Sequence, residues 1–390
     1  MSRKLLMIPG PIEFEAEVLR AMGAQTTSHV AADFIDAFGS TIEMMRKVFL
    51  SDSGQPFIIS GSGTLAMDIA AANLVEPGDR VLVLVTGYFG DRFAEILNRY
   101  GATVDRIKAD LGNSVDMEAV DRKLKSGNYK LLTVTQVDTS TGVAVDVKRL
   151  GDLAHQYGTL VVLDGVCSVA GEELRQEAWQ IDVVLTASQK AIGVPPGLAL
   201  VNVSKRAMDS WHSRKMPVQN YYADFSNWLP VMEAYEERKP SYFATPPVNH
   251  IWALNISLNQ ILEEGMETRF IRHRLLSNGI QNAIEALDLK QLPANRDISA
   301  NTLSAIYYPD GVEGSKLLKK INSEGIIFAG GLLPEIKNRY FRIGHMGSTS
   351  PGELMQAIYA LEIALKDGGY QFEVGAGLLA AERVFSGQTS

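Results

Sequence analysis

The segment TLVVLDGVCS, residues 159–168, is a short apolar run that ends in an aspartate, Asp164. Segments of the same kind recur between residues 57 and 203, and they read FIIS, RVLVLV, ATVDRI, LLTVTQV, DVVLTA and LALVNV. Short continuous apolar runs separated by amphipathic segments predict parallel strands that helices cover on both faces. The sequence therefore predicts an α/β fold with a mostly parallel, seven-stranded sheet.

Polar residues follow several of these strands directly. In such sheets, ligands bind at the carboxyl ends of the strands. The candidates for function are therefore residues 60–64, 86–89, 138–141 and 188–190 together with Asp164.

A lysine, Lys190, lies in the segment LTASQKAIGVPPG, residues 185–197, directly after a strand of buried type. Burial lowers the pKa of an ammonium group, and a neutral amine is the nucleophile that forms a Schiff base. The alternative is a lysine whose stem follows apolar surface while its ammonium reaches solvent.

The aspartate favours the first interpretation. Asp164 precedes Lys190 by about one strand-helix-strand unit, which brings both residues to the same edge of the sheet. A carboxylate beside a Schiff-base lysine suits pyridoxal phosphate, because it keeps the ring nitrogen protonated. The alternative role for Asp164 is a cap on the following helix.

The turn SGSGT, residues 60–64, leads into a helical pattern and predicts a phosphate site at the start of that helix. A dinucleotide site requires an acidic residue at the end of the next strand, but RVLVLV ends in Thr86 and Gly87. The hydroxyl groups suit a single phosphate dianion. Tyr88 and Phe89 follow this strand. An aromatic side chain at this place would either stack on the pyridine ring of pyridoxal phosphate or pack in the core.

Composition excludes several other classes. The 390-residue chain has a net charge of −8 with scattered basic residues, so we expect no nucleic-acid or membrane partner. Its single cysteine, Cys167, suits a reducing compartment, and the spacing of its six histidines predicts no metal site. We expect a cytoplasmic protein, since no signal peptide, membrane span or C-terminal Ser-Lys-Leu is present.

The pattern changes after residue 248 to long helical periodicity that Gly265 and Gly279 interrupt. Beyond it, SAIYY and YFRIG read as strands, with helices near 314–323 and 351–366. We expect an N-terminal arm (1–20), a large cofactor-binding domain (21–265) and a small α+β domain (266–390).

These motifs together resemble the alanine–glyoxylate and serine–pyruvate aminotransferases, which are fold-type I, class V enzymes that use pyridoxal phosphate. The resemblance runs from IPGPIEF (8–14) to YFRIGHMG (340–347) through SGSGT, TSTGV, VVLDGVCS, SQKAIGVPPG and YFATPPV. It implies that Lys190 bonds the cofactor and moves the substrate proton, while Asp164 pairs with the ring nitrogen and Phe89 stacks on the ring.

The resemblance also assigns the remaining contacts. It implies phosphate binding by Ser62, Gly63, Thr64 and Gln189, with Tyr242 and Thr245 reaching the same phosphate from the neighbouring subunit of a homodimer. It places Thr139 near the phenolic oxygen of the cofactor. The chain departs from well-known members, which carry His and Trp where this sequence has Thr64 and Phe89, and this departure bears on cofactor affinity.

Arg342 is the substrate anchor by resemblance, and a planar guanidinium binds a carboxylate in two parallel hydrogen bonds. The alternative is a structural ion pair. His345 is predicted to be a packed or surface histidine and Cys167 an inert thiol. His29 is placed at either the substrate entrance or a helix start, and Glu172 and Glu173 on a solvated loop.

We therefore predict an enzyme that moves an amino group from L-alanine or L-serine to glyoxylate in a ping-pong reaction, giving glycine. The alternative with the same cofactor is a 2-aminoethylphosphonate–pyruvate aminotransferase. A cysteine desulfurase is disfavoured because no separate loop cysteine exists. An NAD-dependent dehydrogenase lacks its acidic residue, and a non-catalytic binding protein would not need both Lys190 and Asp164.

Overall fold

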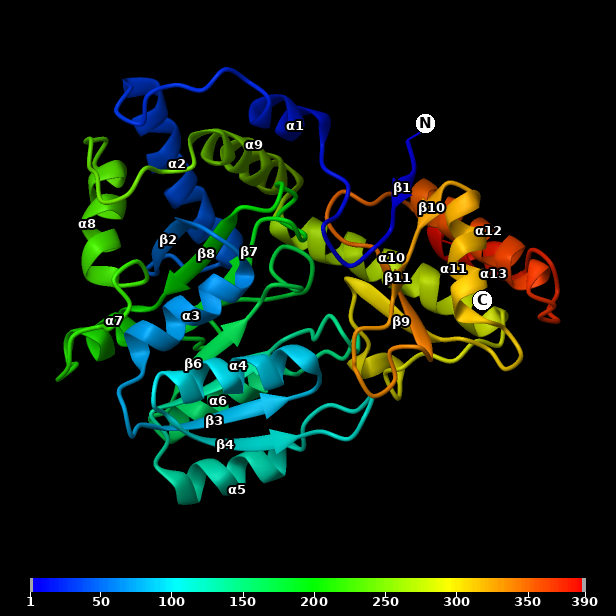
Figure 1. Cartoon of the computed structure of the whole chain (residues 1–390), viewed down its shortest axis with the longest axis horizontal. Coiled ribbons are helices and arrows are strands. Elements are labelled where there is room, and N and C mark those ends of the chain that lie inside the picture. The colour runs from blue at the N-terminus through cyan, green and yellow to red at the C-terminus, as the bar shows by residue number, and fades with distance from the viewer. Residues whose placement is uncertain (1–2, 388–390) are drawn as a thin grey trace.

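The computed structural model describes residues 3–387 and contains the predicted seven-stranded sheet (Figure 1). Its strands run in the order β2-β8-β7-β6-β5-β3-β4. Their bounds are β2 (Gln55–Ser60), β3 (Arg80–Val85), β4 (Thr103–Lys108), β5 (Leu131–Thr135), β6 (Leu160–Asp164), β7 (Val183–Ala187) and β8 (Leu198–Val203). Every apolar run predicted to be a strand is one. The C-terminal tripeptide used to predict the location lies outside the described residues.

The sheet is mostly parallel, as predicted, and one strand runs against the others. β8 pairs antiparallel with both β7 and β2, whereas the other pairs in the sheet are parallel. The physical reason is the short connection of residues 188–197, which contains no crossover helix, and a parallel return needs one. The connection between β6 and β7 also differs from the expected strand-helix-strand unit, because turns and irregular chain replace the helix.

Helices cover both faces of the sheet (Figure 1). α3 (Gly63–Leu74) and α4 (Tyr88–Arg99) lie over one face, and α5 (Met117–Gly127) and α6 (Val147–Gln156) over the other. The end of the sheet near β2 is flanked by α1 (Ala16–Met22), α2 (Ala32–Phe49), α7 (Lys205–His212), α8 (Phe225–Glu236) and α9 (Val248–Glu264). Apart from the edge strand β4, the strands are therefore largely buried on both faces, as their apolar residues require.

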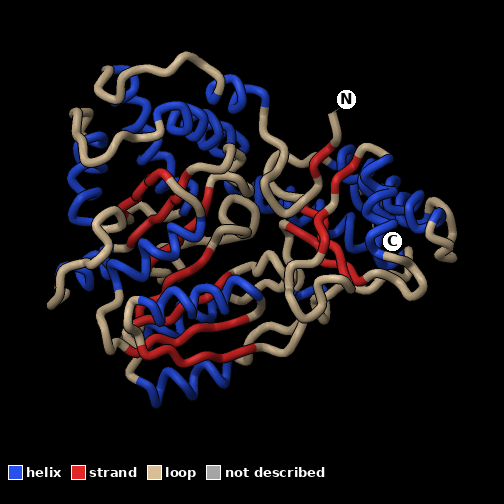
Figure 2. The backbone as a smooth tube through the Cα atoms, in the orientation of Figure 1, coloured by secondary structure: helices blue, strands red, loops and turns tan. Residues whose placement is uncertain are grey.

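A smaller α+β unit follows, to the right in Figures 1 and 2. Its three-stranded antiparallel sheet has the order β11-β12-β9. The elements are α10 (Met266–Ala286), η1 (Arg296–Ile298), β9 (Leu303–Tyr307), α11 (Gly314–Ser323), β10 (Ile326–Ile327), β11 (Ala329–Gly330), β12 (Tyr340–Gly344), α12 (Pro351–Asp367) and α13 (Ala376–Phe385). The N-terminal strand β1 (Leu5–Leu6) joins this unit by pairing with β10.

The change between the two hydrophobic cores falls within α10. Met266 and Phe270 pack in the core of the large sheet, whereas Leu276, Ile280 and Ile284 of the same helix pack in the smaller core. Met7 of the N-terminal arm also belongs to the smaller core. We propose residue 266, where α10 begins, as the boundary between the large and the small domain. The helix α10 then joins the two units.

Gly279 does not interrupt this helix, contrary to the prediction. It lies inside α10, and a Cβ atom at this position would come within 2.3 Å of the Phe385 ring of α13. The glycine therefore serves close packing of α13 against α10, which is a common reason for glycine within a helix.

Within residues 3–387, no helix is both long and apolar enough to span a membrane.

Candidate active site

A cavity of about 240 Å³ lies at the carboxyl edge of the large sheet. Eight residues predicted from the sequence line it, namely Ser62, Gly63, Thr64, Phe89, Thr139, Asp164, Gln189 and Lys190. They come from the ends of β2, β3, β5, β6 and β7. Residues far apart in the sequence thus meet because parallel strands end at one edge.

Lys190 is buried in the turn after β7, and its Nζ atom donates a hydrogen bond to the carbonyl of Pro9. Gly10 packs directly on this side chain, and a Cβ there would lie 2.8 Å from Nζ. Burial lowers the pKa of Lys190, and the nearby Arg342 lowers it further. The amine is therefore closer to the neutral, nucleophilic form than an exposed lysine is.

Asp164 ends β6 and is also buried. Its Oδ1 atom accepts a hydrogen bond from the backbone N–H of Val166 (3.0 Å), and Oδ2 accepts one from the hydroxyl of Thr135 (3.1 Å). Burial raises the pKa of the carboxyl group to about 6, and the buried Asp138 contributes to this rise. A cationic partner entering the cavity would favour the ionised carboxylate.

The glycine turn begins α3, with Ser62 as its N-cap residue in an extended conformation. Gly63 packs so closely on Val166 that a Cβ would lie 2.8 Å from a methyl group of that valine. The first N–H groups of a helix have no partner within the helix, and the helix dipole adds positive potential there. The turn therefore offers backbone donors to an anion in the cavity.

Phe89 is held by a buried carboxylate at the start of α4. Asp138 accepts a hydrogen bond from the backbone N–H of Phe89 (2.9 Å), and the Ser140 hydroxyl accepts one from that of Tyr88 (3.0 Å). Burial raises the pKa of Asp138. These bonds fix the ring of Phe89 at the wall of the cavity.

Arg342 lies on β12 of the smaller unit, and it contacts the cavity-lining Thr139 without itself being one of the residues that line the cavity. Its Nε atom donates to the Gly330 carbonyl (2.9 Å) and Nη1 donates to the Thr139 carbonyl (3.1 Å). Burial lowers its pKa. The alternative of a structural ion pair is not found within residues 3–387, where Nη2 also has no protein acceptor. The guanidinium therefore keeps donors available for a ligand.

Tyr242 and Thr245 do not line the cavity. Tyr242 is 63% exposed, and its hydroxyl lies 3.5 Å from that of Thr245 in the loop before α9. His29, predicted at either an entrance or a helix start, lies in a turn before α2 with its ring centroid 5.5 Å from that of Tyr242.

Two further expectations concern buried side chains. His345 is a packed histidine, fully buried with its Nε2 atom 3.1 Å from the Ser304 hydroxyl, and burial lowers its pKa to about 4. The Cys167 thiol is buried at the cavity wall, and burial raises its pKa, which suits an unreactive thiol.

Glu172 is not on a solvated face, so that prediction was wrong. The residue is only 6% exposed, and its carboxylate accepts hydrogen bonds from the backbone and side-chain nitrogens of Asn301 in the smaller unit. Burial raises its pKa to about 7. Its neighbour Glu173 is half-buried and pairs with Arg175.

This burial predicts a pH-dependent stability. The raised pKa means that the folded chain keeps a proton on Glu172 between pH 4.5 and 7, whereas the unfolded chain releases it. The free energy of unfolding should therefore fall as pH rises through this window, by up to about 3 kcal/mol at roughly 1.4 kcal/mol per pKa unit. Urea unfolding at pH 5 and pH 8 should show a larger fall in the wild type than in Glu172→Gln, because the variant keeps only the contributions of other buried groups such as Asp164.

The glutamine variant should fold, because the Asn301 amide can rotate to present its oxygen to the new amide group. Glu173→Gln is the matched control and should keep the wild-type difference. An equal difference in Glu172→Gln would contradict the assignment.

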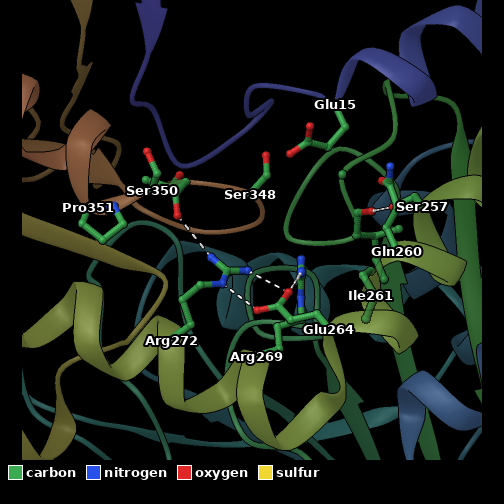
Figure 3. A pocket seen from close by; sticks show the side chains of 13 residues that line it. Glu15, Ser257, Gln260, Ile261, Glu264, Arg269, Arg272, Ser348, Ser350 and Pro351 are labelled. Atoms are coloured by element: carbon green, nitrogen blue, oxygen red, sulfur yellow. Dashed lines mark hydrogen bonds and ion pairs between the residues drawn. The ribbon is translucent and has the colours of Figure 1, made fainter. Parts of the chain in front are cut away.

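A second cavity, of about 400 Å³, is lined in part by Ile192 and Gly193, which follow Lys190 in the chain. Figure 3 shows side chains that line this cavity. Arg269 and Arg272 project into it from α10, and both pair with Glu264, at 2.7 Å and 2.6 Å. Arg269 also donates to the carbonyl of Ala191, next to Lys190 (2.7 Å). Glu264 balances one of these two positive charges and Glu15 also lines the cavity, and we assign no chemistry to it.

Two parts of the first cavity were not predicted from the sequence. Gly10 and Pro11 line it from the N-terminal arm, and no local pattern indicates that the arm returns to Lys190. Arg92 lines it from α4. Its position one helical turn after Phe89 is a signal that could have identified it.

Comparison with known proteins agrees with this geometry. A model described as aminotransferase class-V matches residues 13–333. Alanine–glyoxylate aminotransferase 1 of Saccharomyces cerevisiae is 40% identical over 360 residues, 88% of this chain and 92% of the yeast protein. Serine–glyoxylate aminotransferase of Arabidopsis thaliana is 29% identical over 385 residues, 97% of this chain and 94% of the plant protein.

The crystal structure of an alanine–glyoxylate aminotransferase from Nostoc sp. superposes with a TM-score of 0.87 and 31% identity, covering 94% of this chain and 96% of that one. The fold is thus that of the fold-type I transferases, with its lysine and carboxylate at the carboxyl edge of the sheet. Within that class, the chain belongs to the class-V aminotransferase family. It is an aminotransferase, and the family to which it belongs uses pyridoxal phosphate.

Proposed function

We propose that this chain binds pyridoxal 5′-phosphate in the 240 Å³ cavity and transfers an amino group from L-alanine or L-serine to glyoxylate. The observation that carries the proposal is the meeting of Lys190 and Asp164, both buried, in one cavity beside the start of α3. An amine, a carboxylate and a helix N-terminus match the aldehyde, ring nitrogen and phosphate of the cofactor.

Each of these residues would contact a different part of the cofactor. Ser62, Gly63, Thr64 and Gln189 would bind the phosphate, with Phe89 stacked on the ring and Thr139 near the phenolic oxygen. Asp164 would hold a proton on the ring nitrogen, and Lys190 would bond the aldehyde carbon.

When bound, the cofactor supplies an electron sink that makes the Cα–H bond of an amino acid acidic. Lys190, released as a neutral amine, would take the Cα proton and return it at C4′ of the cofactor. Its lowered pKa supports this role, because a base must be unprotonated before it accepts a proton. Release of pyruvate or hydroxypyruvate completes one half-reaction, and glyoxylate takes the amino group in the other to give glycine.

The names of the relatives support the choice of substrates, since the yeast, plant and Nostoc proteins are all named for glyoxylate. Steady-state rates test it, with a panel of L-alanine, L-serine and 2-aminoethylphosphonate as donors against glyoxylate and pyruvate as acceptors. We expect the largest kcat/KM for glyoxylate with alanine or serine. A larger value for 2-aminoethylphosphonate with pyruvate would favour the alternative aminotransferase.

We propose Arg342 as the anchor of the substrate carboxylate. Arg342→Lys should lower kcat/KM for every amino-acid donor and for glyoxylate by about 10- to 100-fold, since one ammonium cannot replace two parallel charge-assisted hydrogen bonds. Lysine keeps the charge, so the loss measures the geometry of the guanidinium. If only one of several donors were affected, the anchor would lie elsewhere.

We also propose a homodimer in which each site is completed by the partner chain. The exposure of Tyr242 supports this, as does the neighbouring Tyr221, which is 75% exposed and has its ring centroid 5.4 Å from that of Phe243. Exposed aromatic surface of this kind is typical of interaction sites. Tyr242 and Thr245 would then reach the phosphate of the partner's site.

Mixing two inactive chains tests this assembly. One chain carries Lys190→Ala, and the other carries Tyr242→Ala with Thr245→Ala. In a mixed dimer one site collects both lesions and the other has none, because a two-fold interface is reciprocal. Co-refolding equal amounts should give about half heterodimers, and hence roughly a quarter of all sites intact. Heterodimers that recover no activity would mean that Tyr242 and Thr245 do not serve the partner's site.

A further inference from the structure

In the described part of the chain, three charged side chains line the 240 Å³ cavity, and the proposed function uses two of them. Lys190 and Asp164 have their roles at the aldehyde and at the ring nitrogen. Arg92 is the third, and neither the sequence motifs nor the proposed reaction assigns it a partner.

Arg92 is held in place at the cavity by hydroxyl groups and ring faces. Its Nη1 atom donates a hydrogen bond to the Thr64 hydroxyl (3.2 Å), and Nη2 lies 3.4 Å from the Tyr88 hydroxyl. The guanidinium carbon is 4.9 Å from the centroid of the Phe89 ring and 5.0 Å from that of Tyr88. The side chain therefore extends from α4 toward the start of α3.

No carboxylate within residues 3–387 compensates this charge. The adjacent Asp91 pairs instead with Arg106 (3.3 Å) and Lys108 (3.2 Å). Arg92 itself is half-buried, with only neutral acceptors within hydrogen-bond reach. A half-buried guanidinium without an anion, beside a helix N-terminus, is a typical binding site for a phosphate.

We infer that Arg92 binds the phosphate group of the cofactor together with the start of α3. The inference rests on the proposed function and completes its charge balance. In the proposed function Lys190 would be committed to the aldehyde and Arg342 to the substrate carboxylate. Arg92 is then the cation that this chain supplies to the phosphate dianion, because the neighbouring Thr64 carries a hydroxyl group and no charge.

The test compares pyridoxal 5′-phosphate with pyridoxal, which lacks the phosphate. Both are titrated spectroscopically into the full-length chain after removal of cofactor by dialysis with a hydrazine. Arg92→Gln should weaken binding of the phosphorylated form by about 10- to 100-fold, the usual effect of losing a charge-assisted hydrogen bond. Binding of pyridoxal should change by less than about twofold, since neutral contacts remain.

Two variants sharpen the comparison. Arg92→Lys keeps the charge and should recover most of the affinity for pyridoxal 5′-phosphate. Arg99→Gln, two turns later on α4 and exposed, is the matched control and should bind both compounds like the wild type. Circular dichroism and thermal unfolding establish that each variant is folded.

Wild-type affinity of Arg92→Gln for pyridoxal 5′-phosphate would overturn the inference while leaving the proposed function intact. An equal loss for both compounds would also overturn it, because Arg92 would then act through the Phe89 ring. A wild-type chain that binds neither compound would instead refute the proposed function and the inference with it.

Discussion

Lys190→Ala should abolish transamination, with kcat lowered by at least about 10⁴-fold, the upper range for loss of one acid–base group. The effect is the largest we expect, because the same amine both bonds the cofactor and moves the substrate proton. Among residues 3–387, no second lysine lines the cavity to replace it. The measurement is single-turnover and steady-state kinetics with L-alanine and glyoxylate.

The loss should be chemical and not structural. Lys190 is buried with a lowered pKa, so its removal relieves a desolvated amine and should leave the fold intact. Millimolar methylamine should restore part of the rate by entering the space that the side chain leaves. Lys205→Ala, at an exposed position on α7, is the control. Turnover within tenfold of the wild type in Lys190→Ala would contradict the assignment.

Asp164→Asn should reduce kcat by about 10²- to 10⁴-fold while the cofactor stays bound. An amide cannot keep the ring nitrogen protonated, so the electron sink is lost although the contacts remain. The variant should fold, since Oδ1 keeps the Val166 N–H and the new amide nitrogen can donate to the Thr135 hydroxyl.

The absorption spectrum gives the second measurement for this variant. The spectrum of the cofactor bound to Asp164→Asn should change with pH in a range where the spectrum of the wild-type enzyme does not change. The reason is that a carboxylate no longer holds the proton on the ring nitrogen. Near-normal turnover with an unchanged spectrum would mean that Asp164 only caps the turn that follows β6.

The part of the fold with strong local patterns could be predicted from the sequence. The apolar runs define all seven strands of the large sheet, and the position of Asp164 and Lys190 after two of them brings both side chains to one edge. This works because parallel strands that are buried on both faces require continuous apolar residues and expose functional groups at their carboxyl ends.

Long-range contacts explain what the sequence did not predict. In the sequence, Glu172 is one of two adjacent carboxylates in a loop. In the fold it is covered by Asn301, which is distant in the sequence. The N-terminal arm contacts Lys190 through Pro9, and no periodicity encodes that return. Arg92 lies on α4, whose first turn is held by a hydrogen bond to Asp138. Each depends on a partner from another element.

The central claim is that Lys190 bonds pyridoxal phosphate in the cavity where Asp164 lies. Borohydride reduction of the purified enzyme, followed by proteolysis and mass mapping of the peptides, tests it most directly. We predict one stable cofactor adduct per chain, on the peptide that contains Lys190. An adduct on a different lysine, or no adduct after incubation with pyridoxal phosphate, would contradict the account.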